Sequence, residues 1–502
     1  MSDTNIQPDT QQPFSIDKII NQSILRVLYN GVLSQALHYL IIVFVLYQEQ
    51  YILTSFNGYA FIENFVKIFP IIFLVSYEIP EFFEQYFANK KMTTYQTGNS
   101  VEDINRQEFT TNCIVALLML IIPATQSVIF RTLQVDENYR AMFLLSTVLG
   151  IIGPFKATIM SIFIHKQNYV YIMSCKMMTL IVHFSLFTFI YSFKTRETGI
   201  NTWASGFSKP IADIAIYIVI LVVLFKGNIF STKINLDADQ SIEFSLKPQK
   251  KDWKEIGKNL VAFFQYLVFF VSRPVVYFFI AFKINKLTDT SIKQDAIINL
   301  YLYTFIQQTF SFIAKGCHSA LMTTVPIIFN HKQYKKALKI ICYSCLLSLI
   351  YNEIMSAVFV LDSNSVFILF FNQLNDPILK NYFESGEYKT LLKSTVFFIG
   401  TDVLQYATNT YAYLTNYHFI PLIIGLLRII CGVFLTAGMD SQLGQNASYD
   451  EVFFYFELMC TILAVIFCIQ AYISMLINYK SETSEKKNKK AKEKIVDDFI
   501  FT

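Results

Sequence analysis

Charged and amide side chains recur at helical spacing inside apolar segments of the sequence. Two segments each carry three of them at positions i, i+3 and i+7, which lie on one face of a helix. The two sets are Glu78, Glu81 and Gln85, and Asp402, Gln405 and Asn409. An ionised side chain at the centre of a membrane-spanning helix costs at least about 2.5–3.5 kcal/mol, so such residues are paired, face water or serve a function. The patterns therefore predict a polar cavity between helices.

Other apolar segments also contain ionisable residues. They are Lys156, Lys176, Asp213, Arg273, Lys315, Glu353, Arg428 and Glu457. Three charged residues, Lys176, Lys315 and Glu84, lie near the predicted ends of their helices. Long charged side chains at such positions can reach the membrane surface, and this is the interpretation favoured for these three.

Asp402 differs from those residues because it is a short acid, several positions inside its segment and without a basic neighbour in sequence. Two interpretations remain open for it. It faces a water-filled cavity as a functional acid, or it is the structural partner of a basic residue such as Arg273 or Arg428.

The chain lacks the sequence signatures of common enzymes. It has no glycine-rich phosphate loop, no His-Glu-x-x-His motif and no nucleophile elbow. Its six histidines are scattered, and its eight cysteines nearly all fall inside apolar runs without a matching zinc-ligand cluster. The sequence therefore predicts that the protein is not an enzyme and has no metal site, no cofactor and no nucleic-acid partner.

Long apolar helices must position the polar residues. The 502-residue chain is 54% hydrophobic and 16% charged, with a mean hydropathy of +0.41, whereas about a quarter of the residues in soluble proteins are charged. Runs of about 20 residues, enough to span the hydrocarbon, lie near 22–47, 59–87, 110–133, 141–164, 169–193, 210–231, 259–282, 297–328, 337–361, 394–415, 419–438 and 451–478. The predicted fold class is an all-α membrane protein of about 12 transmembrane helices in two pseudo-symmetric six-helix bundles.

Polar stretches divide the chain into five predicted parts. They are an N-terminal tail at 1–20, an N-terminal six-helix bundle at 21–231, a linker at 232–258, a C-terminal six-helix bundle at 259–478 and a basic tail at 479–502. Lysine and arginine are more frequent on the side of the linker and the tail, so the positive-inside rule places both termini in the cytosol. We expect a multi-pass protein of the plasma membrane or an endomembrane, surrounded by membrane lipids, whose basic tail is a candidate surface for protein partners.

Several local patterns resemble the multidrug and toxic compound extrusion (MATE) transporters of the MOP flippase superfamily. The tenth run resembles that family's Phe-x-x-x-Asp-x-x-Gln segment, with Asp402 as the acid and Gln405 as the glutamine. The remaining matches are Gln85 in the second run, Pro154 in the fourth, and the spacing of Gly316, Ala320 and Val325 in the eighth. The resemblance covers roughly residues 20–475.

The resemblance implies a secondary transporter that exports small organic solutes by cation-coupled antiport, with alternating access about a site between two halves. It implies that Asp402, Gln405 and Asn409 carry coupling to H⁺ or Na⁺. It further implies a cavity lined by Gln265, Arg273, Tyr277, Glu78, Glu81, Gln85 and Asp213. The substrate would be a small organic or lipid-like molecule.

The seventh run departs from the family, which usually offers a glutamate there as a cation ligand. This chain offers Gln265, Ser272 and Arg273 instead. Two alternatives to solute transport therefore stay open. One is a degenerate, non-transporting subunit with a structural or anchoring role in a membrane complex. The other is a lipid or glycolipid flippase, in which Lys156, Lys176 and Arg273 contact phosphate groups.

Overall fold

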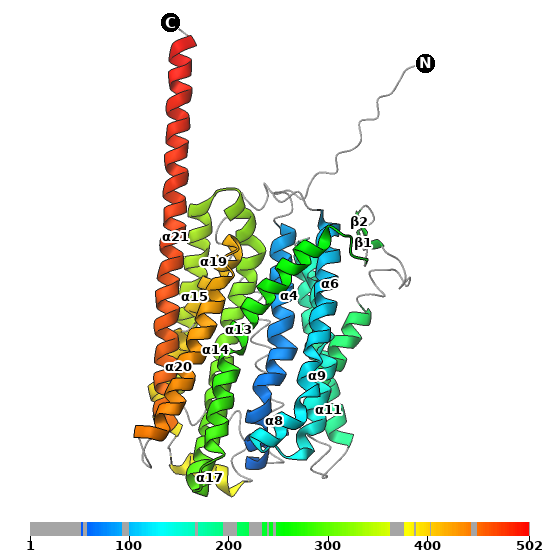
Figure 1. Ribbon diagram of the computed structural model, residues 1–502, viewed down its shortest axis with the longest axis vertical. Coiled ribbons are helices and arrows are strands. Elements are labelled where there is room, and N and C mark those ends of the chain that lie inside the picture. Colours follow the sequence, from blue (N-terminus) through cyan, green and yellow to red (C-terminus); the bar gives the residue numbers. More distant parts are fainter. Residues whose placement is uncertain are drawn as a thin grey trace.

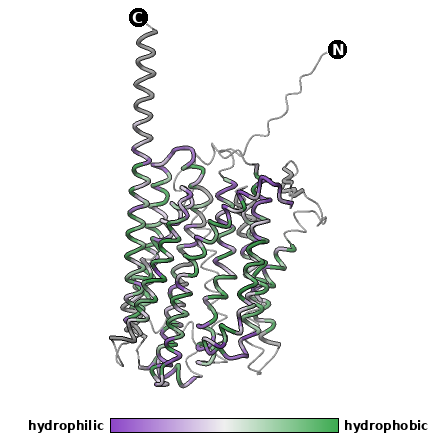
Figure 2. The backbone as a smooth tube through the Cα atoms, viewed as in Figure 1, coloured by the Kyte–Doolittle hydropathy of each residue, from purple (hydrophilic) through white to green (hydrophobic). Residues whose placement is uncertain are grey.

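The computed structural model describes most of the chain as long helices in one bundle (Figure 1). The described residues are 52–53, 58–92, 100–165, 169–193, 208–219, 233–237, 240–243, 247–361, 376–385, 388–401, 403–442 and 449–500. Within these ranges, seven helices are long and apolar enough to cross a membrane. Polar residues gather towards the two ends of the bundle, and apolar residues dominate between them (Figure 2). The protein is therefore an integral, multi-pass membrane protein.

The N-lobe is the name used here for described residues 58–219. The second apolar run predicted from the sequence is a helix of this lobe, from Gly58 to Met92. It contains a π-helical turn, η2 (Leu74–Glu78), followed by α4 (Ile79–Met92). The other elements are α6 (Val101–Met119), α7 (Ile121–Ala124), α8 (Gln126–Leu133), η3 (Glu137–Tyr139), α9 (Arg140–Gly150), α10 (Gly153–His165), α11 (Tyr169–Phe193) and helical residues 208–219.

The C-lobe follows a short antiparallel hairpin of β1 (Lys233–Asp237) and β2 (Gln240–Glu243), in which Lys233 pairs with Glu243. Its helices are α13 (Asp252–Ile284), α14 (Thr290–Asn330), α15 (Tyr334–Leu361), α17 (Pro377–Ser385), α18 (Tyr388–Thr401), α19 (Leu404–Thr415), α20 (Phe419–Gln442) and α21 (Tyr449–Ile500). We call the end of the bundle near the hairpin the linker end and the end near α17 the opposite end (Figure 1).

Each predicted run after the first has a described helix, whereas the run at 22–47 lies outside the described residues. Several described helices extend beyond their predicted runs. The third helix begins at Val101, where the Ser100 side chain accepts a hydrogen bond from the Asp103 backbone amide. The seventh begins at Asp252, inside the predicted linker, and the last continues to Ile500 through the predicted tail. Hydropathy identifies the part of a helix in lipid, whereas its polar continuation contributes no apolar signal.

Pro154 opens a helix instead of interrupting one. The chain turns between α9, which ends at Gly150, and α10, which begins at Gly153. A proline near the first helical turn loses little, because amide groups there have no intrahelical acceptor. The Pro154 carbonyl accepts a hydrogen bond from the Asn112 side-chain amide at 2.9 Å. Gly153 permits the close approach of this break to the second helix, because a Cβ there would lie 2.5 Å from Cγ of Pro80.

Aromatic side chains fill much of the contact between the lobes, which we call the seam. It joins η2, α4 and α6 to α13 and α14. Phe65 and Tyr301 meet across it with ring centroids 6.3 Å apart. Nearer the linker end, Phe82 lies 5.6 Å from Phe263 and 5.3 Å from Tyr266. The seam is therefore a packed apolar interface, and the polar sites lie beside it or interrupt it.

Candidate transport site

A polar pocket of about 110 Å³ lies inside the N-lobe, among η2, α4, α10, α11 and residues 208–219. This volume holds several water molecules. Its lining combines three lysines with three carboxylates, which are Lys156, Lys176, Lys209, Glu81, Glu84 and Asp213. We call this set the N-lobe charge cluster. Opposite charges in equal number offset much of the cost of burying each one.

Asp213 is the centre of this cluster because it has two basic partners. The Lys156 ammonium lies 2.5 Å from Oδ1 of Asp213, and the Lys209 ammonium lies 2.7 Å from Oδ2. Lys156 also donates to the Thr179 hydroxyl at 2.9 Å, and Lys209 donates to the Ser76 carbonyl at 3.0 Å. Sequence reasoning missed Lys209, although its i, i+4 spacing to Asp213 is a readable signal.

Glu84 and Lys176 form a second ion pair in the same pocket, at 2.7 Å. Both side chains are largely buried, so the prediction that they reach the membrane surface was wrong. Glu81 also lines the pocket and accepts a hydrogen bond from the Gln85 side chain at 2.8 Å. The pairing depends on α10, which packs against both α4 and α11, an arrangement that sequence position does not reveal.

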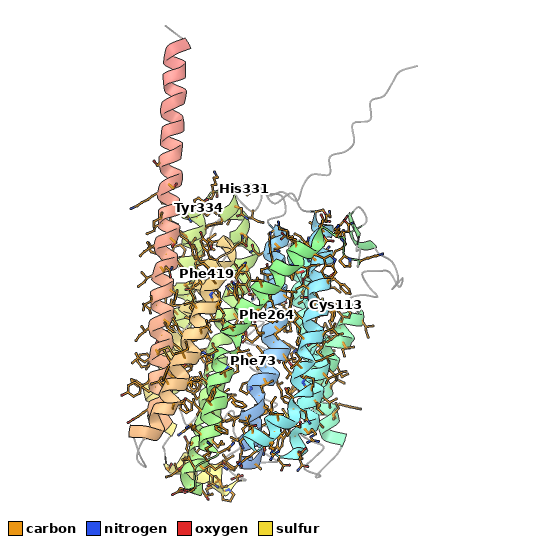
Figure 3. The ribbon with its side chains drawn as sticks, in the orientation of Figure 1. Phe73, Cys113, Phe264, His331, Tyr334 and Phe419 are labelled. Carbon is orange, nitrogen blue, oxygen red and sulfur yellow. The ribbon has the colours of Figure 1, made fainter. Side chains whose placement is uncertain are left out.

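Glu78 leaves the N-lobe pocket and pairs with Lys315 of α14 across the seam. Glu78 ends the π-helical turn, whose wider spacing changes the direction of the side chains it carries. Lys315 is buried, and its ammonium lies 4.8 Å from the ring centroid of Phe73, a residue that lies between the two ends of the bundle (Figure 3). The surface-reaching interpretation of Lys315 was therefore wrong, and this ion pair connects the two lobes inside the membrane.

Arg273 lies in a different place, in an ion pair of the C-lobe with Glu457 of α21. Its second guanidinium nitrogen lies 3.1 Å from the other carboxylate oxygen, so the pair is bidentate. The Tyr303 hydroxyl donates to Glu457, and Arg273 donates to the Tyr277 hydroxyl at 3.5 Å. Phe453 stacks on Tyr303 with centroids 4.4 Å apart. Aromatic rings thus enclose Arg273, its acid and Tyr277.

Gln405 and Asn409 are buried on α19, and their role in cation coupling stays a prediction. Arg428 of α20 donates to the side-chain oxygen of Gln405 at 3.5 Å. Asp402 lies outside the described residues, so both interpretations of it, the cavity-facing acid and the structural partner of a basic residue, stay predictions. Gln265 lies apart from these two residues, in a cavity at the linker end. The residues predicted to line one cavity therefore occupy several distinct sites.

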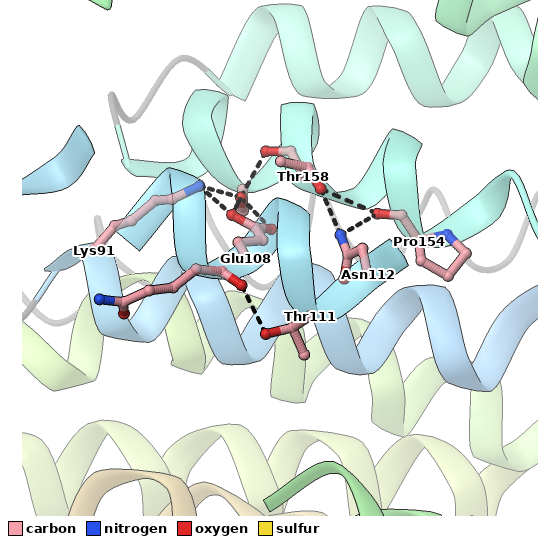
Figure 4. Close-up of polar contacts among 8 residues, drawn as sticks. Lys91, Glu108, Thr111, Asn112, Pro154 and Thr158 are labelled. Atoms are coloured by element: carbon pink, nitrogen blue, oxygen red, sulfur yellow. Dashed lines mark hydrogen bonds and ion pairs between the residues drawn. The ribbon is translucent and has the colours of Figure 1, made fainter. Parts of the chain in front are cut away.

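A buried polar network at the linker end of the N-lobe was also missed (Figure 4). Lys91 and Glu108, both fully buried, pair at 2.6 Å, and the Ser161 hydroxyl donates to Glu108 at 3.0 Å. Asn112 donates to the Thr158 hydroxyl at 2.6 Å. Lys91 and Glu108 lie between the predicted apolar runs at 59–87 and 110–133, so hydropathy did not single them out. Glu108 and Asn112, four residues apart, were the available signal of one polar helix face.

No family model and no curated protein matches the chain, but solved structures do. A MATE crystal structure in complex with MaL6 has a TM-score of 0.70 at 12% identity, over 92% of this chain and 99% of that one. An outward-facing multidrug resistance MATE transporter of the MOP superfamily has a TM-score of 0.70 at 10% identity, over 92% and 98%. A third structure is that of a MOP superfamily transporter from Pyrococcus furiosus Vc1 (DSM3638), with a TM-score of 0.69 at 12% identity, over 92% of this chain and 98% of that one. The binding pocket of that transporter is described as having reverse polarity, which suggests a different function for it.

These similarities extend over nearly the whole of the compared chains, and the compared proteins are transporters. They confirm the predicted all-α, MATE-like fold class. At identities of 10–12%, these similarities show a common fold; they do not show the substrate or the coupling ion. The chain has the fold of the MATE membrane transporters.

Proposed function

We propose that the protein is a secondary transporter that moves a small organic solute by alternating access, coupled to protons. The observation that carries this proposal is the N-lobe charge cluster around a pocket with room for water. Charged groups inside a membrane protein are costly, and they usually mark the path of an ion or substrate. Both termini are proposed to lie in the cytosol, as the distribution of lysine and arginine indicates.

Proton coupling fits the cluster better than sodium coupling. Asp213 already has an ammonium group beside each oxygen, at 2.5 and 2.7 Å, and Glu84 has Lys176 at 2.7 Å. Oxygens occupied in this way are poor ligands for Na⁺. Two ammonium groups hold Asp213 in its ionised form, so in this proposal a proton reaches Asp213 only in a state in which Lys156 and Lys209 have moved away. Protonation there would change the charge offered to a solute. The coupling role proposed for Asp402, Gln405 and Asn409 is retained as a second step in the C-lobe.

Polar contacts across the seam support alternating access. At the linker end, Arg106 Nε lies 3.1 Å from Asp252 Oδ2. At the opposite end, the Asn285 side-chain amide donates to the Leu133 carbonyl at 2.7 Å. Such contacts can exchange with water when one end opens, while the other end stays closed.

Transport by purified protein in liposomes tests the proposal. With a pH gradient imposed, we expect the wild type to move a fluorescent organic cation and Asp213→Asn to lose gradient-driven movement. Glu137→Gln is the matched control, because it removes an exposed carboxylate from the same lobe. Asp402→Asn tests the C-lobe role separately. Undiminished transport by Asp213→Asn would overturn the assignment of the pocket.

A non-transporting subunit is the second candidate, and the aromatic packing of the seam favours it. Tyr266 and Tyr413 stack with centroids 4.5 Å apart near Phe82, inside the space between the lobes. If the lobes never separate, the protein serves as a scaffold. Purification that yields the chain only with a stoichiometric partner, together with no transport by the wild type, would favour this role.

The flippase alternative gains no support from the described contacts. Lys156, Lys176 and Arg273, the residues expected to contact phosphate, each have a carboxylate partner. A phosphate group would have to displace those carboxylates before it could bind.

A further inference from the structure

A second cavity, of about 760 Å³, crosses the seam at the linker end. Its N-lobe wall comes from the end of α4 and the first turns of α6, and its C-lobe wall comes from the start of α13 and the loop before α20. Its polar lining includes Lys90, Lys254, Lys258, Gln265, Glu255 and His418. The volume lies in the range of ligand sites, about 300–1,000 Å³.

Positive charge exceeds negative charge in this cavity. Glu255 is the carboxylate among its lining residues, and it faces three lysines. Its two oxygens are shared between Lys258, at 2.6 Å, and Lys90, at 3.8 Å. Lys254 has no ion-pair partner among the residues that the structure describes. An anion entering the cavity would therefore find ammonium groups that one carboxylate does not neutralise.

Lys90 and His418 are held in place by buried neighbours, as in a binding site and unlike lysines scattered over a surface. Asn259 accepts a hydrogen bond from the Lys90 ammonium, which lies 5.3 Å from the ring centroid of Tyr86. His418 Nδ1 is buried and has no hydrogen-bond partner in the described part of the chain. Burial, and then the charge of Lys90, lower the pKa of His418 from 6.5 to about 4. The imidazole is thus neutral, with one N–H group available to donate.

Gly257 keeps one wall of the cavity open. It lies inside α13, where glycine costs about 1 kcal/mol relative to alanine, and a Cβ added there would meet no atom within 4 Å. Packing therefore does not require glycine at this position. A longer side chain would extend into open space at the cavity wall, which provides a way to block the site without disturbing the core.

We propose that this cavity binds a phosphate-bearing anion, either the headgroup of an anionic phospholipid or a soluble organic phosphate. Lysine ammonium groups bind phosphate as point charges, and the imidazole N–H adds a directional contact. Trp253, one residue before Lys254, is 54% exposed, as is typical of tryptophan at the level of the lipid headgroups. The ligand contacts both lobes and so stabilises the linker end of the seam in its closed arrangement. This site is separate from the N-lobe charge cluster and does not depend on its role in transport.

Competition binding to the full-length protein tests the proposal. Native mass spectrometry would count phosphatidylglycerol and phosphatidylcholine bound from mixed micelles that contain equal amounts of each. Glycerol 3-phosphate, added in excess, is the soluble probe. We expect phosphatidylglycerol to be retained over phosphatidylcholine, and about tenfold weaker retention in Lys90→Gln/Lys254→Gln/Lys258→Gln.

Two matched controls separate the site from general charge and folding effects. Lys332→Gln/Lys335→Gln/Lys339→Gln removes the same charge at the same end of the molecule, near His331 and Tyr334 (Figure 3), and should retain the lipid. Gly257→Phe should lose the lipid with all lysines present, whereas Gly257→Ala should keep it. This pair stays informative if the triple lysine variant fails to fold.

The outcomes are distinct. Loss of phosphatidylglycerol on addition of glycerol 3-phosphate identifies a soluble phosphate as a ligand of the site, and resistance to it identifies the lipid headgroup. Equal retention of the two lipids with no binding of glycerol 3-phosphate overturns the proposal. Equal loss in the control triple variant, or unchanged binding in Gly257→Phe, overturns it as well.

Discussion

The N-lobe and the C-lobe both bury ionised side chains, but they surround them differently. In the N-lobe, Asp213 sits beside two lysines at the wall of a pocket of about 110 Å³. In the C-lobe, Glu457 is 0% exposed and is enclosed by Arg273, Tyr303 and packed aromatic rings. Water can solvate a charge in the first site when a partner leaves, whereas the second offers no such compensation. The same type of ion pair can therefore serve as an exchangeable site in one lobe and as a structural contact in the other.

The largest expected effect is the loss of the C-lobe acid. Glu457→Gln leaves the Arg273 guanidinium buried without a counter-charge, which typically costs about 3–5 kcal/mol. Thermal unfolding of the purified protein in detergent would measure the loss. The double variant Arg273→Leu/Glu457→Leu is the control and should recover most of the stability. Equal losses in the single and double variants would contradict a structural ion pair.

The next largest loss of stability is expected where α13 packs closely against α20. A Cβ at Gly425 would lie 2.7 Å from the Val268 carbonyl oxygen, so Gly425→Ala should cost about 1–3 kcal/mol by overpacking. Gly438→Ala, on the same helix, meets no atom within 4 Å and should gain up to about 1 kcal/mol from helix propensity. The two variants compared in one unfolding assay test how rigid the C-lobe is. Similar values for both would argue against tight packing there.

A smaller loss of stability is expected in the N-lobe, although the effect on transport should be large. Asp213→Asn leaves Lys156 and Lys209 beside a pocket that can hold water, so we expect a cost of about 1–2 kcal/mol. The same unfolding assay, run next to the transport measurement, separates stability from activity. A loss as large as that of Glu457→Gln would remove the distinction drawn between the lobes.

The effect that is smallest near neutral pH is a pH dependence at the seam. The pKa of His418 is about 4 in the folded protein, below its ordinary value of 6.5, so the unfolded state binds more protons between these values. Stability from this group is therefore present above pH 6.5 and is lost as the pH falls towards 4, with a slope of at most about 1.4 kcal/mol per pH unit. His418→Gln should flatten the unfolding profile in this window. An unchanged profile would contradict a buried, neutral imidazole.

Part of the candidate site could be predicted from the sequence. The apolar runs gave the helices, and their charged interruptions identified Asp213, Arg273, Lys315 and Glu457 as unusual. The contact between Lys209 and Asp213 could also be predicted from local spacing, because the two residues are four positions apart on one helix. The contact from Lys156 to Asp213 spans 57 residues, and that from Arg273 to Glu457 spans 184. No periodicity within a single helix predicts contacts of this kind.

The sequence by itself determined that lipid surrounds most of the chain, because its apolar runs are longer, and contain fewer charged residues, than the core of a soluble protein requires. Its motifs also led to the MATE fold, which the solved structures confirm. Only the tertiary structure decided which charges meet. It turned Glu78 towards Lys315 and Glu84 towards Lys176, and it enclosed Arg273 with Glu457. Electrostatic energy depends on distance through space and on nearby water, and helix packing fixes both.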